Sequence, residues 1–181
     1  MKNDKFLKLE KNICKVVKEE QIKLGYQSET IRLYYPLESL NLLLSMDCNT
    51  EEMRQVLGEF AKSVCPRLGE VQISHRGERF CICLPPEAAD YVNENTPKEG
   101  FLYDLIAVVG THYATMSQVE EVFGKYSAGV CRERMDTEDF DELLYFEDGV
   151  PDEDYYCFKT EGEHLIYHRF TKEDYQALFG K

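Results

Sequence analysis

The side chains best suited to bind a charged partner lie between residues 50 and 80, on a predicted helix and on the hairpin that follows it. Guanidinium, ammonium and amide groups donate hydrogen bonds to phosphates and carboxylates. Three such groups fall on the exposed side of a helix over residues 50–64, one follows that helix, and two flank the hairpin tip. The candidate contacts for a nucleic acid or a protein partner are Arg54, Gln55, Lys62, Arg67, Arg76 and Arg79.

The charge of this helix argues against a DNA-reading role. Its exposed side also carries Glu51, Glu52 and Glu59, so three acidic residues oppose Arg54 and Lys62. A surface that reads DNA is normally clearly basic. We therefore expect protein contacts first, and binding to duplex DNA stays open as the alternative.

A second candidate is the acidic tract over residues 136–154, which holds ten acidic residues and no basic ones. The spacing of an EF-hand is absent, because the glycine of the tract precedes its last acidic residues instead of lying in mid-loop. A solvated acidic loop is the favoured interpretation, and a site for a basic partner or a hard cation is the alternative. The carboxylates concerned are Asp148, Asp152, Glu153 and Asp154.

The cysteine and histidine side chains do not predict a metal centre. The seven cysteines are scattered without a CxxC motif, which favours reduced thiols. Cys81 and Cys83 share one face of a predicted strand, while His75 projects to the opposite face. His164 and His168 share a strand face but lie about 13 Å apart, too far to chelate one ion. We expect no metal ion and no cofactor.

The chain also lacks the common catalytic motifs. It contains no P-loop, no GxGxxG after a strand, no GxSxG, no HExxH and no zinc-ribbon spacing. No catalytic residue is predicted, and we expect that the protein is not an enzyme. An enzyme with an unrecognised site, such as a Cys–His nucleophile from Cys131 or Cys157, is the weaker alternative.

The segment over residues 31–92 has to position the basic candidates. It reads as a strand, a helix, a tight turn, a second helix, a β-hairpin and a further helix. Asn49 and Glu52 have the spacing of a capping box, which predicts the start of the second helix, and Pro66 predicts its end. Together with an amphipathic helix before it, this order is typical of a winged helix-turn-helix.

The alternation of apolar residues predicts the register of the hairpin. With a turn centred on Arg76 and the glycine after it, Ile73 faces Phe80 and Val71 faces Ile82. All four apolar side chains then point to one side of the hairpin. Cysteine and small polar side chains occupy the other side.

The second half of the chain predicts helices followed by an antiparallel sheet. A polar run over residues 93–100 marks a boundary between two lobes. We therefore expect an α+β protein with a winged-helix-like lobe over residues 1–96 and an acidic lobe over residues 97–181. The expected strands of the second lobe are residues 130–135, 141–147, 155–159 and 164–170.

A faint internal echo links residues 76–84 and 162–170. In each, a Gly-Glu turn precedes an apolar strand and then a helix. A second wing-like unit and chance both account for so short a likeness.

Charge divides the chain more clearly than composition does. Residues 1–100 carry 14 basic and 16 acidic residues, whereas residues 101–181 carry 7 basic and 18 acidic residues. The second half should therefore repel nucleic acid. The N-terminus is charged throughout and resembles no signal peptide, and no apolar stretch is long enough to span a bilayer. These features predict a cytoplasmic protein without membrane contact.

Three stretches of the chain resemble a known family. They are KLEKNICKVVKEEQIKLGYQSETIRLYYPLESL, YFEDGVPDEDYYC and IYHRFTKEDY. Together they resemble an uncharacterised bacterial family of about this length, a domain of unknown function, over the whole chain. The resemblance implies a bacterial, cytoplasmic protein and implies nothing about activity.

The sequence therefore favours a non-enzymatic binding or adaptor protein that acts through protein–protein contacts. A homodimer is one form that such contacts can take. The alternative is a winged-helix transcriptional regulator that uses the helix over residues 50–64 and the wing over residues 76–79.

Overall fold

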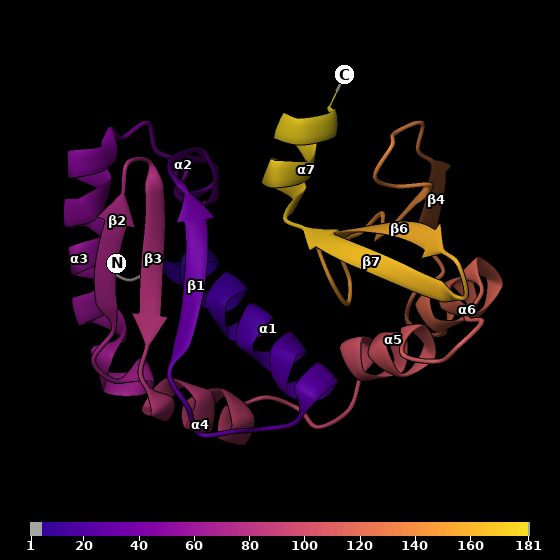
Figure 1. The fold of residues 1–181 in the computed structure, drawn as a ribbon, viewed down its shortest axis with the longest axis horizontal. Helices are drawn as coiled ribbons and strands as arrows, with labels where there is room; N and C mark the ends of the chain where they lie inside the picture. The colour runs from indigo at the N-terminus through magenta and orange to yellow at the C-terminus, as the bar shows by residue number, and fades with distance from the viewer. Residues whose placement is uncertain (1–4, 181) are drawn as a thin grey trace. The chain divides into compact units, whose positions relative to one another are not determined.

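The computed structural model describes residues 5–180, and its internal contacts divide the chain into two compact units with a boundary between Thr96 and Pro97. Each unit combines helices with one antiparallel sheet, so the predicted α+β class is confirmed (Figure 1). Within the described residues no helix is both long and apolar enough to cross a membrane.

The first unit consists of four helices and a three-stranded sheet. Its strands lie in the order β1-β3-β2, so that β3 pairs with both neighbours, as Figure 1 shows in magenta and indigo. The elements follow one another as the sequence predicts. They are α1 (Leu7–Leu24), β1 (Ile31–Pro36), α2 (Leu37–Leu44), α3 (Thr50–Leu68), β2 (Gln72–Arg76), β3 (Arg79–Leu84) and α4 (Pro86–Asn95).

Helix α3 begins at the predicted capping box. The Asn49 side chain accepts a hydrogen bond from the backbone N–H of Glu52 at 3.0 Å, and the Glu52 carboxylate accepts one from the Asn49 N–H at 2.9 Å. These two bonds satisfy donors that the first turn of a helix leaves without a partner.

The prediction that Pro66 ends α3 is wrong, because the helix continues to Leu68. The proline leaves one carbonyl of the preceding turn without its N–H partner, yet the two residues after it stay helical. The helix ends instead at Gly69, whose φ of 73° is readily adopted by glycine. A Cβ at this position would also lie 2.9 Å from a side-chain carbon of Pro85.

The hairpin of β2 and β3 has a different register from the predicted one. It closes over a two-residue turn of Gly77 and Glu78, and Ile73 pairs with Ile82 instead of Phe80. Gly77 has a φ of 58°, which suits the first central position of such a turn. The predicted faces are nevertheless correct, because a shift by two residues keeps every side chain on its own side.

One face of this sheet packs on the helices. Phe80, Ile82 and Leu84 of β3 are buried and belong to one core with residues of α1, α2, α3 and α4. The apolar stripe of α3 supplies the largest share of that core. Its buried members are Met53, Leu57, Phe60, Val64 and Leu68.

The second unit consists of three helices and a four-stranded sheet in the order β4-β5-β6-β7, and all its pairings are antiparallel. Each predicted strand of this lobe is present, with small differences in its ends. The elements are α5 (Phe101–Val109), α6 (Met116–Tyr126), β4 (Val130–Arg134), β5 (Glu142–Phe146), β6 (Tyr155–Glu161), β7 (His164–Phe170) and α7 (Lys172–Phe179).

Aromatic rings dominate the core of the second unit. The ring of Phe123 in α6 lies 4.8 Å from that of Phe101, 4.9 Å from that of Phe146 and 5.6 Å from that of Tyr156. Helices α5 and α6 therefore meet one face of the four-stranded sheet through edge-to-face and stacked rings. Helix α7 instead contacts the opposite face, where its Tyr175 ring lies 4.8 Å from that of Tyr155.

Candidate functional site

The strongest candidate for a binding surface is the face of the three-stranded sheet that points away from the helices, hereafter the open sheet face. Cross-strand register aligns its side chains in three rows across β1, β3 and β2. All but the two cysteines are exposed, and these two are half-buried. Its residues are Arg32, Cys83 and Gln72 in the first row, Tyr34, Cys81 and Ser74 in the second, and Pro36, Arg79 and Arg76 in the third.

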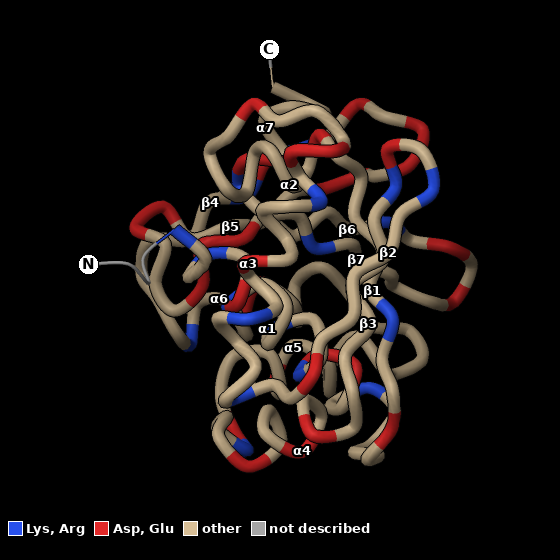
Figure 2. The backbone as a smooth tube through the Cα atoms, turned by 90° about the vertical axis from the view of Figure 1, so that its left-hand side faces the viewer, with Lys and Arg blue, Asp and Glu red and all other residues tan. Residues whose placement is uncertain are grey.

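The open sheet face is basic, with one acidic residue beside it, Glu78, in the turn between Arg76 and Arg79. The three strands contain no aspartate and no glutamate, and within residues 5–180 no ion pair is formed by Arg32, Arg76 or Arg79. Figure 2 marks the basic positions of these strands in blue, close to the labels β1, β2 and β3. This surface therefore presents three guanidinium groups to a partner.

Two of the arginines oppose each other in the sheet. Arg76 and Arg79 are direct cross-strand partners at the closing pair of the hairpin. Like charges in directly opposite positions destabilise a strand pair. A bound anion would relieve this repulsion, so the closing pair is suited to binding a carboxylate or a phosphate.

An exposed aromatic ring adjoins these arginines. The Tyr34 side chain is 55% exposed, which is unusual for so large a ring, and its centroid lies 5.4 Å from the guanidinium carbon of Arg79. This distance is within the range of a cation–π contact, which orients the guanidinium over the ring. An aromatic side chain beside arginines is also typical of the centre of protein–protein interfaces.

Unlike the arginines of the open sheet face, Arg54 of α3 already has a carboxylate partner. The Arg54 guanidinium forms a two-pronged ion pair with Glu51, with contacts of 2.6 and 3.1 Å, and Glu59 pairs with Lys5 at 2.9 Å. Gln55 is exposed near this pair and contributes to lowering the pKa of Glu51, after the larger effect of Arg54. The exposed side of α3 is thus largely neutralised by its own neighbours.

The remaining two predicted contacts diverge. Lys62 is exposed on α3, whereas Arg67 reaches back to α1 and binds both carboxylate oxygens of Glu10 at 2.6 and 2.8 Å. This bidentate pair links two helices that lie far apart in the sequence, so Arg67 stabilises the unit and does not extend the binding surface. The pKa of Arg67 is raised by this bond to Glu10.

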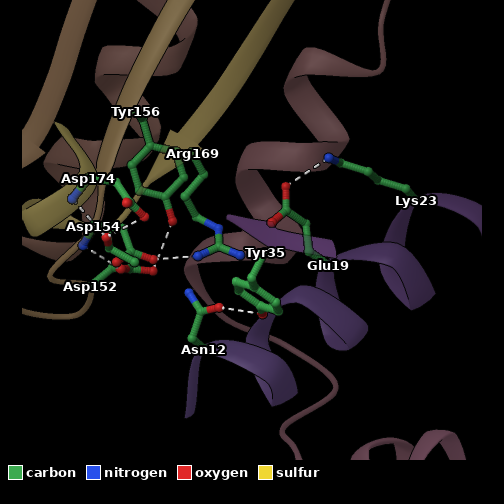
Figure 3. Close-up of polar contacts among 10 residues, drawn as sticks. Asn12, Glu19, Lys23, Tyr35, Asp152, Asp154, Tyr156, Arg169 and Asp174 are labelled. Atoms are coloured by element: carbon green, nitrogen blue, oxygen red, sulfur yellow. Dashed lines mark hydrogen bonds and ion pairs between the residues drawn. The ribbon is translucent and has the colours of Figure 1, made fainter. Parts of the chain in front are cut away.

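The acidic tract does not act as one solvated loop. Asp152 and Asp154 are buried and bonded within the chain, and Figure 3 shows their contacts. Asp152 accepts hydrogen bonds from the Tyr156 hydroxyl and from the Asp154 backbone N–H, both at 2.9 Å, while Asp154 pairs with Arg169 at 2.5 Å. Burial, followed by the nearby charge of Asp152, raises the pKa of Tyr156 well above its ordinary value.

The other two carboxylates of this candidate set are exposed. Asp148 turns back to accept a hydrogen bond from the Val150 N–H at 3.1 Å, and Glu153 is exposed. The four predicted residues are therefore split between a buried network and the surface. Within residues 5–180 no group of three or more His, Cys, Asp or Glu side chains is arranged to hold a metal ion.

A thiol and an imidazole do lie opposite each other in the four-stranded sheet. Cys157 of β6 is the cross-strand partner of His168 of β7. Cys157 is fully buried, and burial raises the pKa of its thiol to about 12. A catalytic cysteine needs a lowered pKa and access to substrate, so this pair lacks both properties of a nucleophile.

Sequence reasoning selected Arg76 and Arg79 of the open sheet face but missed Arg32 and Tyr34. These two belong to β1, and only its pairing with β3 brings them beside the hairpin. A signal existed in the alternation of Ile31–Pro36, which places them on the polar face of their strand. The partner strand, however, lies about 50 residues away in sequence.

Residues 6–179 match the family described as "Domain of unknown function, E. rectale Gene description (DUF3877)". No curated protein and no solved structure matches the chain.

Proposed function

The chain belongs to this family of domains of unknown function, and from that premise we propose that it is a non-enzymatic binding protein whose open sheet face holds an acidic segment of a partner protein. One observation carries the proposal: Arg32, Arg76 and Arg79 are exposed together beside Tyr34 and have no carboxylate partner of their own.

The chemistry of the surface favours a carboxylate-bearing partner. Guanidinium groups bind carboxylates with two parallel hydrogen bonds, and each arginine of the face has all its donors available. Tyr34 adds a large and rigid contact area at low entropic cost. A segment that combines Asp or Glu with an apolar side chain would satisfy both groups. The partner is another protein or a second copy of this chain.

The setting of such a protein is also a proposal. We read the first unit as a winged-helix-like scaffold that is used for protein contacts, and we place the protein in the bacterial cytoplasm. All seven cysteines are free thiols, which agrees with a reducing compartment.

Binding to duplex DNA is the second candidate, because phosphates and carboxylates are recognised by the same groups. A winged-helix reader of DNA would insert the exposed side of α3 into the major groove. Arg54 is already held by Glu51 on that side, and three glutamates line it. A duplex would meet these carboxylates at close range, which disfavours this mode.

Two charge-reversal variants separate the candidates. R76E/R79E changes the open sheet face, and R54E/K62E changes α3 by the same net charge. Each is used as bait in a native lysate with and without nuclease, and each is titrated against a 20-base-pair duplex at low and high salt.

Protein binding through the sheet predicts a partner that survives nuclease, is lost with R76E/R79E and is retained with R54E/K62E. DNA binding predicts that both variants weaken affinity for the duplex and that added salt abolishes it. The proposal is overturned if the R76E/R79E variant still captures the partner that the wild-type protein captures. Light scattering of the purified protein then tells a homodimer from a different partner.

A further inference from the structure

Two histidines that lie 52 positions apart in the sequence meet in the second unit. His112 lies in the loop between α5 and α6, and His164 is the first residue of β7. Their ring centroids are 4.8 Å apart and the rings are tilted by 49°, so the two imidazoles do not stack in parallel. Both residues are exposed, and a solute can reach them.

A backbone hydrogen bond joins the two segments that carry these histidines. The Tyr113 N–H, next to His112, donates to the carbonyl of Glu163, next to His164, at 2.9 Å. The Tyr113 backbone adopts a φ of 62°, a value that residues other than glycine seldom adopt. The nearby Glu163 carboxylate raises the pKa of the Tyr113 phenol. The loop is thereby fixed to the turn between β6 and β7.

The separation of the rings matches that of two imidazoles on one metal ion. Imidazole nitrogens bind Zn²⁺ at about 2.0–2.1 Å, so each ring centroid lies about 3.2 Å from the metal. Two such rings are then about 4.5 Å apart at a square-planar angle of 90° and about 5.2 Å apart at the tetrahedral angle. The observed 4.8 Å falls between these values.

We propose that His112 and His164 form a two-histidine chelate for a divalent transition metal of the Zn²⁺, Ni²⁺ and Cu²⁺ class. Neutral imidazole suits these ions, and solvent completes the coordination shell. Because the described residues provide no third ligand, binding is exchangeable and weaker than that of a structural zinc site. A bound ion would cross-link the α5–α6 loop to the β6–β7 turn. This site lies in a different unit from the open sheet face and stands independently of it.

The four histidines of the chain supply matched controls for a test with the intact protein. Titration calorimetry with NiCl₂ and with ZnCl₂ should give one site per chain. H112Q and H164Q should each weaken the affinity at least tenfold, because each removes one of two ligands. H75Q and H168Q should leave it unchanged.

A second readout reports the site directly. Substoichiometric Cu²⁺ should broaden the NMR signals of His112 and His164 while those of His75 and His168 stay sharp. Circular dichroism of each variant verifies that the fold is kept. The proposal is overturned if all four variants bind alike, if all four signals broaden together, or if no site with a dissociation constant below 1 mM is found, which corresponds to about −4 kcal/mol.

Discussion

In both sheets of this protein the side chains alternate between two faces, but the second face of one sheet is exposed and that of the other contacts a helix. In both sheets one face is apolar and packs on helices of its own unit. The second face of the three-stranded sheet carries arginines and is exposed. The second face of the four-stranded sheet carries aromatic rings, and α7 contacts it through Tyr175 on Tyr155 and through Phe179 on Phe170. A sheet face becomes available to a partner only where the chain does not return to cover it.

The hairpins of the two sheets sharpen this comparison. Both close over a Gly-Glu turn, and Gly77 and Gly162 have similar φ values of 58° and 60°. The closing pair is Arg76 with Arg79 in the first hairpin but Glu161 with His164 in the second. The same type of turn is therefore flanked by two arginines in one unit and by a glutamate and a histidine in the other.

The largest expected effect tests the difference between the two cores. Phe123→Ala should destabilise the second unit by about 3–5 kcal/mol, because it opens a cavity among three aromatic neighbours. Hydrogen exchange should show faster exchange in the four-stranded sheet than in the three-stranded one. Phe80→Ala is the matched change in the first unit and should reverse this pattern. Equal loosening of both sheets by either variant would show that the units do not unfold separately.

The next effect compares a buried ion pair with a partly exposed one. Asp154→Ala should cost about 3 kcal/mol, because it removes a carboxylate that pairs with the buried Arg169 guanidinium. The double variant D154A/R169M should recover part of this loss in urea unfolding. Glu10→Ala should cost only about 1 kcal/mol, because the Arg67 side chain is 37% exposed and water can replace the lost partner. A double variant that is less stable than D154A would contradict the prediction.

A smaller effect should be common to the two units. Asn49 and Thr115 begin α3 and α6 with the same capping box, so Asn49→Ala and Thr115→Ala should each cost about 1 kcal/mol. Asn49→Asp and Thr115→Ser keep the acceptor oxygen and should cost little. If only one alanine variant lowers the unfolding midpoint, the caps are not equivalent in the two units.

The smallest effect carries the opposite sign. Arg76→Thr should stabilise the first hairpin by about 0.2–1 kcal/mol, because it removes the repulsion across the closing pair with Arg79. The same change should weaken partner binding. Glu161→Thr in the other hairpin faces no like charge and should bring no gain. Thermal unfolding measures both variants, and a destabilising Arg76→Thr would mean that the arginine has an unrecognised structural role.

Local signals in the sequence were reliable where neighbours along the chain decide the structure. Helical periodicity and the Asn49 cap located the start of α3, because the bonds involved span only a few residues. Local reasoning failed where a nearby residue gave a misleading signal. Pro66 did not end its helix, which continues for two more residues, and the hairpin turn lay one position later because Gly77 fits its first central place.

The sequence by itself therefore determined the α+β class, the order of the elements, the side of each strand that is apolar and the charge contrast between the two halves. Only the tertiary structure decided which distant residues meet. It placed Arg32 and Tyr34 beside the hairpin arginines, joined Arg67 to Glu10, buried Asp152 and Asp154, and brought His112 to His164. The physical reason is that periodicity and capping act over a few residues, whereas strand pairing and side-chain burial are set by contacts between segments that the sequence keeps far apart.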